Sequence, residues 1–154
     1  MQQATSVSDL SIANRTLVMG IVNVTEDSFS DGGKWLDIDA AINHARELVA
    51  QGADMIDVGG ESTRPGAVRV EADVEKRRVV PVIKALSELG IRTSVDTMRA
   101  SVARAAAAAG VDMINDVSGG LADPEMYRAM AEAGVPAVSY THLRAHETPE
   151  HLVC

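Results

Sequence analysis

The sequence contains little that would support a disulfide framework, an aromatic core or a membrane span. Cys154 is the only cysteine, so no internal disulfide forms, and this usage fits a reducing cytoplasm. Aromatic residues make up 3%, which leaves aliphatic residues and alanine to fill a core. No apolar run reaches the ~18 residues of a membrane span, and the first residues lack the apolar segment of a signal peptide. We therefore expect a cytoplasmic protein with no membrane partner.

Positive charge is also scarce. The 154 residues carry a formal net charge of -8, with a pI of about 4.9. This balance disfavours nucleic acid as a partner, although small anions can still bind at local sites. The 46% hydrophobic content is sufficient for one modest core at this length.

Four stretches share one plan, in which a helical pattern is followed by a glycine and a short apolar strand. Left-handed helix caps are predicted at Gly52, Gly90, Gly110 and Gly134. Strands are predicted at 17–22, 55–58, 92–95, 113–115 and 136–138. This alternation predicts parallel strands with right-handed crossovers. Two architectures satisfy it: a doubly wound open sheet and a (β/α)₈ barrel.

Helix boundaries are suggested by a few local signals. Asp37 or Asp39 is a candidate cap for the first helix. Asp123 is a candidate cap for the last helix, with Pro124 as its first helical residue. Pro81 predicts a late start or a kink in the second helix.

A carboxylate or carboxamide stands at the end of each complete predicted strand: Asn23, Asp57, Asp96 and Asn115. In both architectures ligands bind at the carboxyl ends of the strands. A single Asp or Asn often only starts a turn or caps a helix, but four at the same end favour a ligand site. Buried carboxylates and amides suit a ligand rich in N–H groups, such as a flat heterocycle.

Two loops next to these strand ends suggest an anion beside the heterocycle. The stretch NVTEDSFSDGG, residues 23–33, is rich in oxygen-bearing side chains, which are the ligands that Mg²⁺ prefers. The stretch ESTRPG places Arg64 next to the hydroxyls of Ser62 and Thr63, and arginine suits phosphate or carboxylate. Together the loops indicate a heterocycle with a magnesium-bound phosphate.

The segments MGIVNVTEDSFSDGG, DVGGESTRPGA, SVDTMR and MINDVSGG occur in this order between residues 19 and 120. In these motifs the chain resembles the dihydropteroate synthases of the pterin-binding family, over about residues 17–138. The resemblance implies a (β/α)₈ TIM barrel, of which the chain supplies four βα units and the start of strand 5. It also implies a folate-pathway transferase that is a sulfonamide target. Such an enzyme condenses 6-hydroxymethyl-7,8-dihydropterin diphosphate with p-aminobenzoate, giving 7,8-dihydropteroate and pyrophosphate.

The resemblance also implies roles for individual residues. The pterin pocket and its catalytic electrostatics would come from Asp57, Asp96 and Asn115. Mg²⁺ and the diphosphate would be held by Asn23 and Asp31. Thr63 and Arg64 would reach the phosphates or the aminobenzoate side. The aminobenzoate site would be built by Phe29, Ser62 and Pro65.

The mechanism implied by the resemblance is dissociative. Pyrophosphate leaves, a resonance-stabilised pterin cation forms, and the arylamine attacks it. Mg²⁺ would stabilise the charge of the leaving group, and the ring-binding carboxylates would stabilise the cation.

A barrel of this type needs about 250 residues, so we expect this chain alone to be inactive, or active only if another polypeptide completes the barrel. We assign residues 1–138 to the amino-terminal part of that barrel. The resemblance also implies that the full-length parent forms a homodimer. Residues 139–154 have three interpretations. They hold His142, His146 and His151, but nothing supports a metal site there. THLRAHETP also weakly resembles the family's segment after the fifth strand. We favour the third interpretation, a translated sequencing adaptor.

Two alternatives to a synthase are considered. A pterin-binding methyltransferase, acting with methyltetrahydrofolate and a corrinoid, would share the pterin carboxylates but would not need the NVTEDSFSDGG and STRPG loops. A non-catalytic pterin-binding fragment would bind a pterin without releasing pyrophosphate.

Overall fold

The computed structural model describes residues 15–25, 33–62 and 69–139, with only the backbone described at 33–37. In these ranges five strands alternate with four helices. The strands are β1 (Met19–Asn23), β2 (Met55–Gly59), β3 (Thr93–Asp96), β4 (Met113–Asp116) and β5 (Ala137–Ser139). The helices are α2 (Gly33–Ala50), α3 (Ala72–Glu88), α4 (Ala100–Ala108) and α5 (Met126–Ala133).

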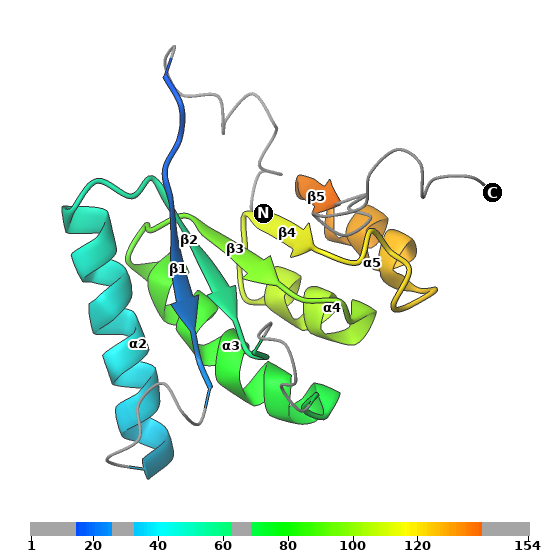
Figure 1. Ribbon diagram of the computed structural model, residues 1–154, viewed down its shortest axis with the longest axis horizontal. Coiled ribbons are helices and arrows are strands. Elements are labelled where there is room, and N and C mark those ends of the chain that lie inside the picture. Colours follow the sequence, from blue (N-terminus) through cyan, green and yellow to red (C-terminus); the bar gives the residue numbers. More distant parts are fainter. Residues whose placement is uncertain (1–14, 26–32, 63–68, 140–154) are drawn as a thin grey trace, which may run out of the picture.

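The strands form one parallel sheet in the order β1-β2-β3-β4-β5. Figure 1 shows β1 and β5 at the two edges and the helices along one face of the curved sheet. A doubly wound sheet reverses its strand order at a switch point, and the described strands show no reversal. The order is that of consecutive βα units of a barrel, which confirms the predicted partial barrel.

The predicted strands all form, although their limits differ by one or two residues. Each observed strand continues one residue past its predicted end, as β1 does to Asn23 and β3 to Asp96. The polar strand-end residues are therefore held in the sheet and not in the following loops. Their side chains are oriented by the backbone hydrogen bonds of the ladder.

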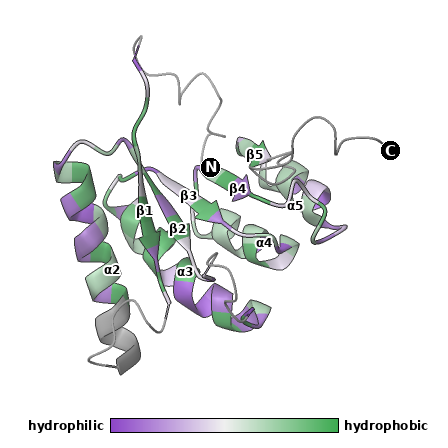
Figure 2. Ribbon diagram, in the orientation of Figure 1, coloured by the Kyte–Doolittle hydropathy of each residue, from purple (hydrophilic) through white to green (hydrophobic). Residues whose placement is uncertain are grey.

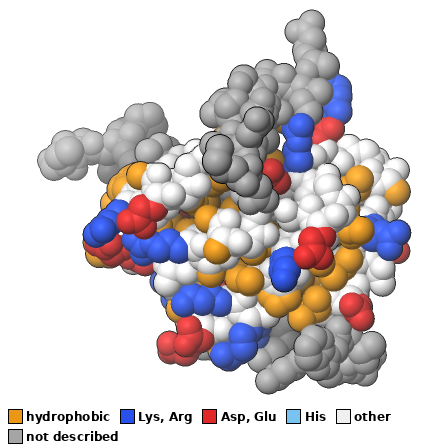
Figure 3. Space-filling model, turned by 180° about the vertical axis from the view of Figure 1, so that it is seen from behind, with side chains coloured by type: hydrophobic (Ala, Val, Ile, Leu, Met, Phe, Trp, Pro, Cys, Tyr) orange, Lys and Arg blue, Asp and Glu red, His pale blue; other side chains and the backbone are white. Residues whose placement is uncertain are grey.

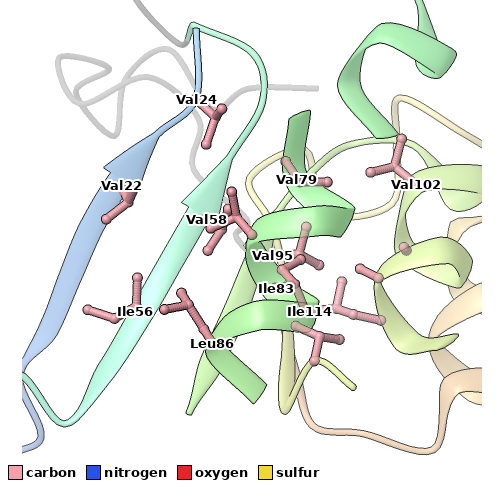
Figure 4. Close-up of a cluster of buried hydrophobic side chains, with 14 of the residues drawn as sticks. Val22, Val24, Ile56, Val58, Val79, Ile83, Leu86, Val95, Val102 and Ile114 are labelled. Carbon is pink, nitrogen blue, oxygen red and sulfur yellow. The ribbon is translucent and has the colours of Figure 1, made fainter. Parts of the chain in front are cut away.

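The core lies between the sheet and the helices. It is built from alternate strand residues, including Val22, Val58 and Ile114, which pack against Ile83 and Leu86 of α3 in one buried cluster. Figure 4 shows these side chains pointing toward one another from the strands and helices. In Figure 2 both the strands and the helices carry hydrophobic stretches interrupted by hydrophilic residues. Burial of each core side chain stabilises the fold by roughly 1.5–3 kcal/mol.

Of the two alternatives that Pro81 predicted for the second helix, the late start is wrong, and the kink stays a prediction. α3 begins at Ala72 and contains Pro81 in its interior. Proline removes one helical N–H and crowds the carbonyl four residues earlier, which costs about 3 kcal/mol in an isolated helix. The residues on either side of it, Val79, Val82 and Ile83, are fully buried, and we infer that their packing offsets this cost.

The predicted cap of the first helix is also wrong, because Asp37 and Asp39 both lie inside α2. The glycine prediction is confirmed: φ is 108° at Gly52, 72° at Gly90, 95° at Gly110 and 64° at Gly134. A positive φ is a conformation that residues with a Cβ rarely adopt. The local signals thus predicted helix ends better than helix starts.

The prediction that Asp123 caps the last helix is wrong, because Glu125 is the N-cap of α5; Asp123 lies in the turn before it and contacts a second helix. Its Oδ1 accepts a hydrogen bond from the Glu125 N–H at 3.0 Å, and its Oδ2 accepts one from the Ala100 N–H of α4 at 2.8 Å. These backbone bonds lower the pKa of Asp123. α5 begins only at Met126, so the prediction of Pro124 as its first residue is wrong. Pro124 lies in a turn closed by the Met126 N–H and the Asp123 carbonyl.

None of the helices within the described ranges is both long enough and apolar enough to cross a membrane. Acidic and basic side chains are interspersed on the face shown in Figure 3. On α4 and α5 the pairs Arg104–Glu132 and Arg128–Glu132, both exposed, are of this kind. Such pairs contribute little stability individually.

Candidate functional site

The carboxyl ends of four neighbouring strands place polar side chains in one row across the sheet. The parallel register joins Asn23 to Gly59, Gly59 to Asp96, and Asp96 to Asn115. Residues in register point to the same face, and the residue before each of them lies in the core under the helices. The row therefore lies on the face that the helices leave open (Figure 1).

Gly59 makes room in the middle of this row. A Cβ at this position would lie 2.9 Å from Oδ1 of Asn23 and 3.8 Å from Oδ2 of Asp96. The space between the Asn23 amide and the Asp96 carboxylate is thus open because Gly59 has no side chain. The sequence alone does not predict that Gly59 leaves this space, because the space depends on the neighbours of Gly59 on both sides in the sheet.

Asp57 lies two residues before Gly59 on the same face, and Asn115 reaches it. The Asn115 Nδ2 donates a hydrogen bond to Asp57 Oδ2 at 3.1 Å. The other oxygens, Asp57 Oδ1 and Asn115 Oδ1, are buried and have no hydrogen-bond partner in the described part of the chain. Burial raises the pKa of Asp57, and the neighbouring Ser94 and Asn115 side chains oppose this rise. An unpaired buried acceptor costs about 1–3 kcal/mol, so this pair is poised to accept N–H donors from a ligand.

Asp96 is the most perturbed carboxyl of the row. Burial foremost, and then the negative charges of Asp57, Glu75, Asp116 and Glu61, raise its pKa to about 6. No described side chain or backbone N–H donates to its carboxylate. At neutral pH the group is mostly ionised although its surroundings disfavour the charge. A cationic or N–H-rich ligand would relieve this unfavourable situation.

A cavity opens beside Asp96 at the ends of β2 and β3. Its wall is formed by Glu61, Ser62, Arg69, Glu75, Asp96, Thr97, Met98, Arg99 and Val117. Two of the predicted site residues, Ser62 and Asp96, thus share one cavity. Asn23, Asp57 and Asn115 do not line it and belong to the adjoining row on the sheet.

The structure also places polar residues that the sequence analysis missed. Glu75, in the first turn of α3, is 2% exposed and accepts a hydrogen bond from Thr97 Oγ1 at 2.6 Å. An acidic residue in a first helical turn is common for reasons of the helix dipole alone. The position of Glu75 in the sequence therefore does not predict its buried hydrogen bond with Thr97, 22 residues later.

Asp116 follows Asn115 but serves the opposite face. It is fully buried and accepts hydrogen bonds from the Ser118 N–H at 2.8 Å, the Ser118 hydroxyl at 2.7 Å and the Gly120 N–H at 2.7 Å. These bonds order the loop after β4. Asp116 is thus hydrogen-bonded within its own loop, whereas the adjacent Asn115 is available on the site face.

Five of the predicted site residues lie outside the described residues: Phe29, Asp31, Thr63, Arg64 and Pro65. Their roles stay predictions. The described ranges contain no group of three or more Asp, Glu, His or Cys side chains able to hold a metal ion. The residue that fits Mg²⁺ is Asn23, whose amide oxygen lies at the open end of β1 against Gly59 and is the kind of hard oxygen donor this cation takes.

Comparison with known proteins agrees with this geometry. A Mycobacterium leprae (strain TN) dihydropteroate synthase is 58% identical over 118 residues, which cover 77% of this chain and 42% of that protein. The solved structure of Xanthomonas albilineans dihydropteroate synthase with 4-aminobenzoic acid is similar with a TM-score of 0.76 and 50% identity, covering 82% of this chain and 46% of that one. The same enzyme in complex with 7,8-dihydropteroate gives a TM-score of 0.76 and 44% identity, with coverages of 88% and 49%.

This chain spans less than half the length of these proteins. The sequence pattern of the family described as pterin binding enzyme matches residues 19–152. That range includes all the described strands and helices and the polar row at the strand ends. The chain belongs to the pterin-binding enzyme family.

Proposed function

We propose that this chain is the amino-terminal half of a dihydropteroate synthase, a transferase of folate biosynthesis. The complete enzyme joins 6-hydroxymethyl-7,8-dihydropterin diphosphate to p-aminobenzoate and releases pyrophosphate. The observation that carries this proposal is a pair of buried acceptors, Asp57 Oδ1 and Asn115 Oδ1, that have no partner among the described residues. The Asp96 carboxylate, whose pKa is raised, lies beside them. The 58% identity to the Mycobacterium leprae synthase supports the proposal.

The proposed role of these acceptors is to bind and polarise the pterin ring. Asp57 Oδ1 and Asn115 Oδ1 accept ring N–H and amino donors, and the Nδ2–Oδ2 bond between the two residues keeps the acceptors oriented. The Asp96 carboxylate lies next to them, across the strand pairing of β3 with β4. When pyrophosphate leaves, positive charge spreads over the ring, and fixed carboxylates in a partly buried site stabilise it.

Asn23 and Asp31 are the residues proposed to hold Mg²⁺ near the diphosphate. The bound ion supplies neutralisation of the charge on the leaving group. Asn23 contributes its amide oxygen at the open end of β1, next to the space over Gly59. Asp31 extends the donor set from the NVTEDSFSDGG stretch, outside the described residues.

The aminobenzoate is proposed to bind on the Ser62 side of the site. Ser62 and Asp96 line the same cavity, and the solved structure of the Xanthomonas albilineans relative is one with 4-aminobenzoic acid. Phe29, Thr63, Arg64 and Pro65 complete this proposed subsite. The substrates are thus two small molecules that approach from neighbouring strand ends.

The other expectations stay proposals. The cytoplasmic location rests on cysteine usage, and the homodimer of a full-length parent rests on the resemblance. The division into residues 1–138 and a non-family tail, 139–154, also stays a prediction, since the family match runs to residue 152 and residues 140–154 lie outside the described ranges. A read of the source DNA across codons 130–160 decides where the family sequence ends.

Turnover by a completed barrel tests the proposed function. We define the completed chain as residues 1–138 joined to the corresponding carboxyl-terminal half of the Mycobacterium leprae relative. With Mg²⁺ and both substrates it should release pyrophosphate, and omission of p-aminobenzoate should stop sustained turnover. Pterin binding without pyrophosphate release would instead identify a non-catalytic binding protein. Methyl transfer from methyltetrahydrofolate to a corrinoid would identify the methyltransferase alternative.

A further inference from the structure

Arg99 joins three segments that are far apart in the sequence. Its Nη1 donates to Glu61 Oε2 at 2.9 Å and also to Glu75, and its Nη2 donates to the carbonyl of Val70. Glu61 follows β2, Val70 precedes α3 and Arg99 follows β3. One guanidinium thus contacts both flanks of the β2–α3 connection from the end of the next strand.

The two flanks are also tied to each other. The Val70 N–H donates to Glu61 Oε2 at 3.3 Å, the same oxygen that Arg99 contacts. On the β2 side, Arg78 Nη1 donates to the Gly60 carbonyl at 3.0 Å. The backbone of Val70 is therefore held at its N–H by Glu61 and at its carbonyl by Arg99.

Burial makes Arg99 hard to replace. The side chains of Glu75 and Glu61 are 2% and 14% exposed, and that of Arg99 is 25% exposed. Loss of one partner from a buried ion pair leaves an uncompensated charge, which is strongly unfavourable. The planar guanidinium has five donors in a fixed fork and serves several acceptors at once, whereas the Lys ammonium acts as a point charge.

The same cluster reaches the site. Glu75 accepts the hydroxyl of Thr97, which follows Asp96 directly. The Thr97 N–H in turn donates to the Asn115 carbonyl at 3.1 Å. Ser62 comes directly after Glu61, and Ser62, Asp96 and Arg99 all line the cavity.

We propose that Arg99 is a positioning residue: it fastens Glu61 and Val70, the two flanks of the β2–α3 connection, to the end of β3, and so fixes Ser62 relative to Asp96 across the cavity. The contacts themselves do not depend on the chemistry of the site. The consequence for catalysis rests on the proposed function. An ion pair that only adds to global stability is the competing explanation.

Limited trypsin digestion of the 154-residue chain tests the fastening directly. Trypsin cleaves after Arg69, at the bond whose N–H is the one that Glu61 holds. Cleavage after Arg92, at the start of β3, reports global unfolding. Arg99→Met should raise the rate of cleavage at Arg69 relative to Arg92 at least tenfold. Arg104→Met, which removes the exposed ion pairs of Arg104 with Glu125 and Glu132, is the matched control and should leave this ratio unchanged.

A second variant covers the case in which Arg99→Met does not fold. Glu61→Ala removes the bonds to Val70 and Arg99 but keeps the Glu75–Arg99 pair, and it should also raise the ratio. A ratio within twofold of the parent for every folded variant would overturn the proposal. So would an equal rise at Arg69 and Arg92, because that is the behaviour of a contact that only stabilises the whole fold.

The completed chain tests the catalytic consequence. Arg99→Met should lower kcat/KM at least tenfold, Arg99→Lys should restore part of it, and Arg104→Met should leave it unchanged. Equal activity of the Arg99→Met and parent proteins would overturn the positioning role even if the digestion changed. An inactive parent would instead contradict the proposed function, while the digestion result would still decide whether Arg99 fastens the two flanks.

Discussion

Two aspartates at opposite ends of the sheet show how this molecule separates stability from function. Asp54 directly precedes β2, at the amino ends of the strands. Both of its oxygens accept hydrogen bonds from Arg15, and one also accepts the Val18 N–H at 2.9 Å. These bonds, that of Arg15 foremost, lower the pKa of Asp54 to about 2.

Asp96 ends β3, at the carboxyl ends of the strands, and its pKa is raised to about 6 by burial and by neighbouring carboxylates. The two residues are chemically identical, yet one is satisfied by its own protein and the other is not. Asp112, just before β4, repeats the first pattern by accepting the Thr93 N–H at 2.9 Å. Asp54 and Asp112, at the amino ends, thus accept hydrogen bonds from the fold itself. At the carboxyl ends, Asp116 is also satisfied by its own loop, whereas Asp96 receives no such bond from the described residues and lies where ligands bind in barrels of this type.

The largest expected effect is on turnover. Asp96→Asn in the completed chain should lower kcat/KM at least about a hundredfold, because a fixed charge opposite the developing cation is lost. The matched change at the other end, Asp54→Asn, should leave kcat/KM within about twofold. Steady-state pyrophosphate release measures both. Comparable losses in the two variants would show that the two ends of the sheet do not differ in function.

Stability should respond in the opposite sense and should depend on pH. The pKa of Asp96 is raised on folding, so its ionisation destabilises the folded state as pH rises from about 4 through about 6. Asp96→Asn should therefore be more stable than the parent at pH 7.5, by about 1–2 kcal/mol after allowance for partial exposure. This difference should shrink as the pH is lowered toward 4.

Asp54 has a lowered pKa, so its stabilisation is present above pH about 4 and is lost as pH falls through about 2. Asp54→Asn should accordingly be less stable than the parent at pH 7.5. Urea unfolding of both variants at pH 7.5 and pH 4 measures these signs. A destabilised Asp96→Asn protein at pH 7.5 would show that the Asp96 carboxylate has a partner within the fold.

A smaller effect is expected at Gly59. A methyl group there would meet the Asn23 amide oxygen at 2.9 Å, in the space between Asn23 and Asp96. Gly59→Ala should lower kcat/KM about tenfold, a loss of about 1.4 kcal/mol in transition-state stabilisation, with little change in stability because the Asn23 side chain can move. Gly52→Ala is the control: it strains a left-handed cap far from the site and should cost about 1 kcal/mol of stability with normal turnover. A loss of turnover in Gly52→Ala together with normal turnover in Gly59→Ala would contradict the role given to Gly59.

The last expected effect is confined to stability and concerns Asp123, which caps the turn before α5 and also bonds to the start of α4. Asp123→Ala should lower the free energy of unfolding by about 1–2 kcal/mol, the usual value of a capping side chain. Turnover at the site should be unaffected. Urea unfolding with a parallel activity assay checks both points, and a loss of activity without a loss of stability would place Asp123 in the site.

Much of this arrangement could be predicted from the sequence, because its signals are local. The four cap glycines and the apolar runs after them predicted the parallel βα units, and the polar residue at each strand end predicted the edge at which the site lies. Pro81 did not delay the start of α3, which begins at Ala72, and Val79 and Val82 beside the proline are buried in the core. Packing across the molecule outweighed the local signal there.

The supporting network could not be predicted, because its partners are distant in sequence. Arg99 meets Glu75 across 24 residues and Glu61 across 38. Gly59 gains its importance only from neighbours on both sides in the sheet. The sequence also does not distinguish Asn115 from the adjacent Asp116, whose side chains point to opposite faces of β4. Such roles follow from register, which the sequence alone did not provide.

The most direct test of the central claim is a crystal structure of the completed chain with 6-hydroxymethylpterin. The account predicts ring N–H or amino groups within about 3 Å of Asp57 Oδ1, Asn115 Oδ1 and the Asp96 carboxylate. A pterin bound elsewhere, with ordered water satisfying these three acceptors, would contradict the claim that the strand ends are left unpaired for the ligand.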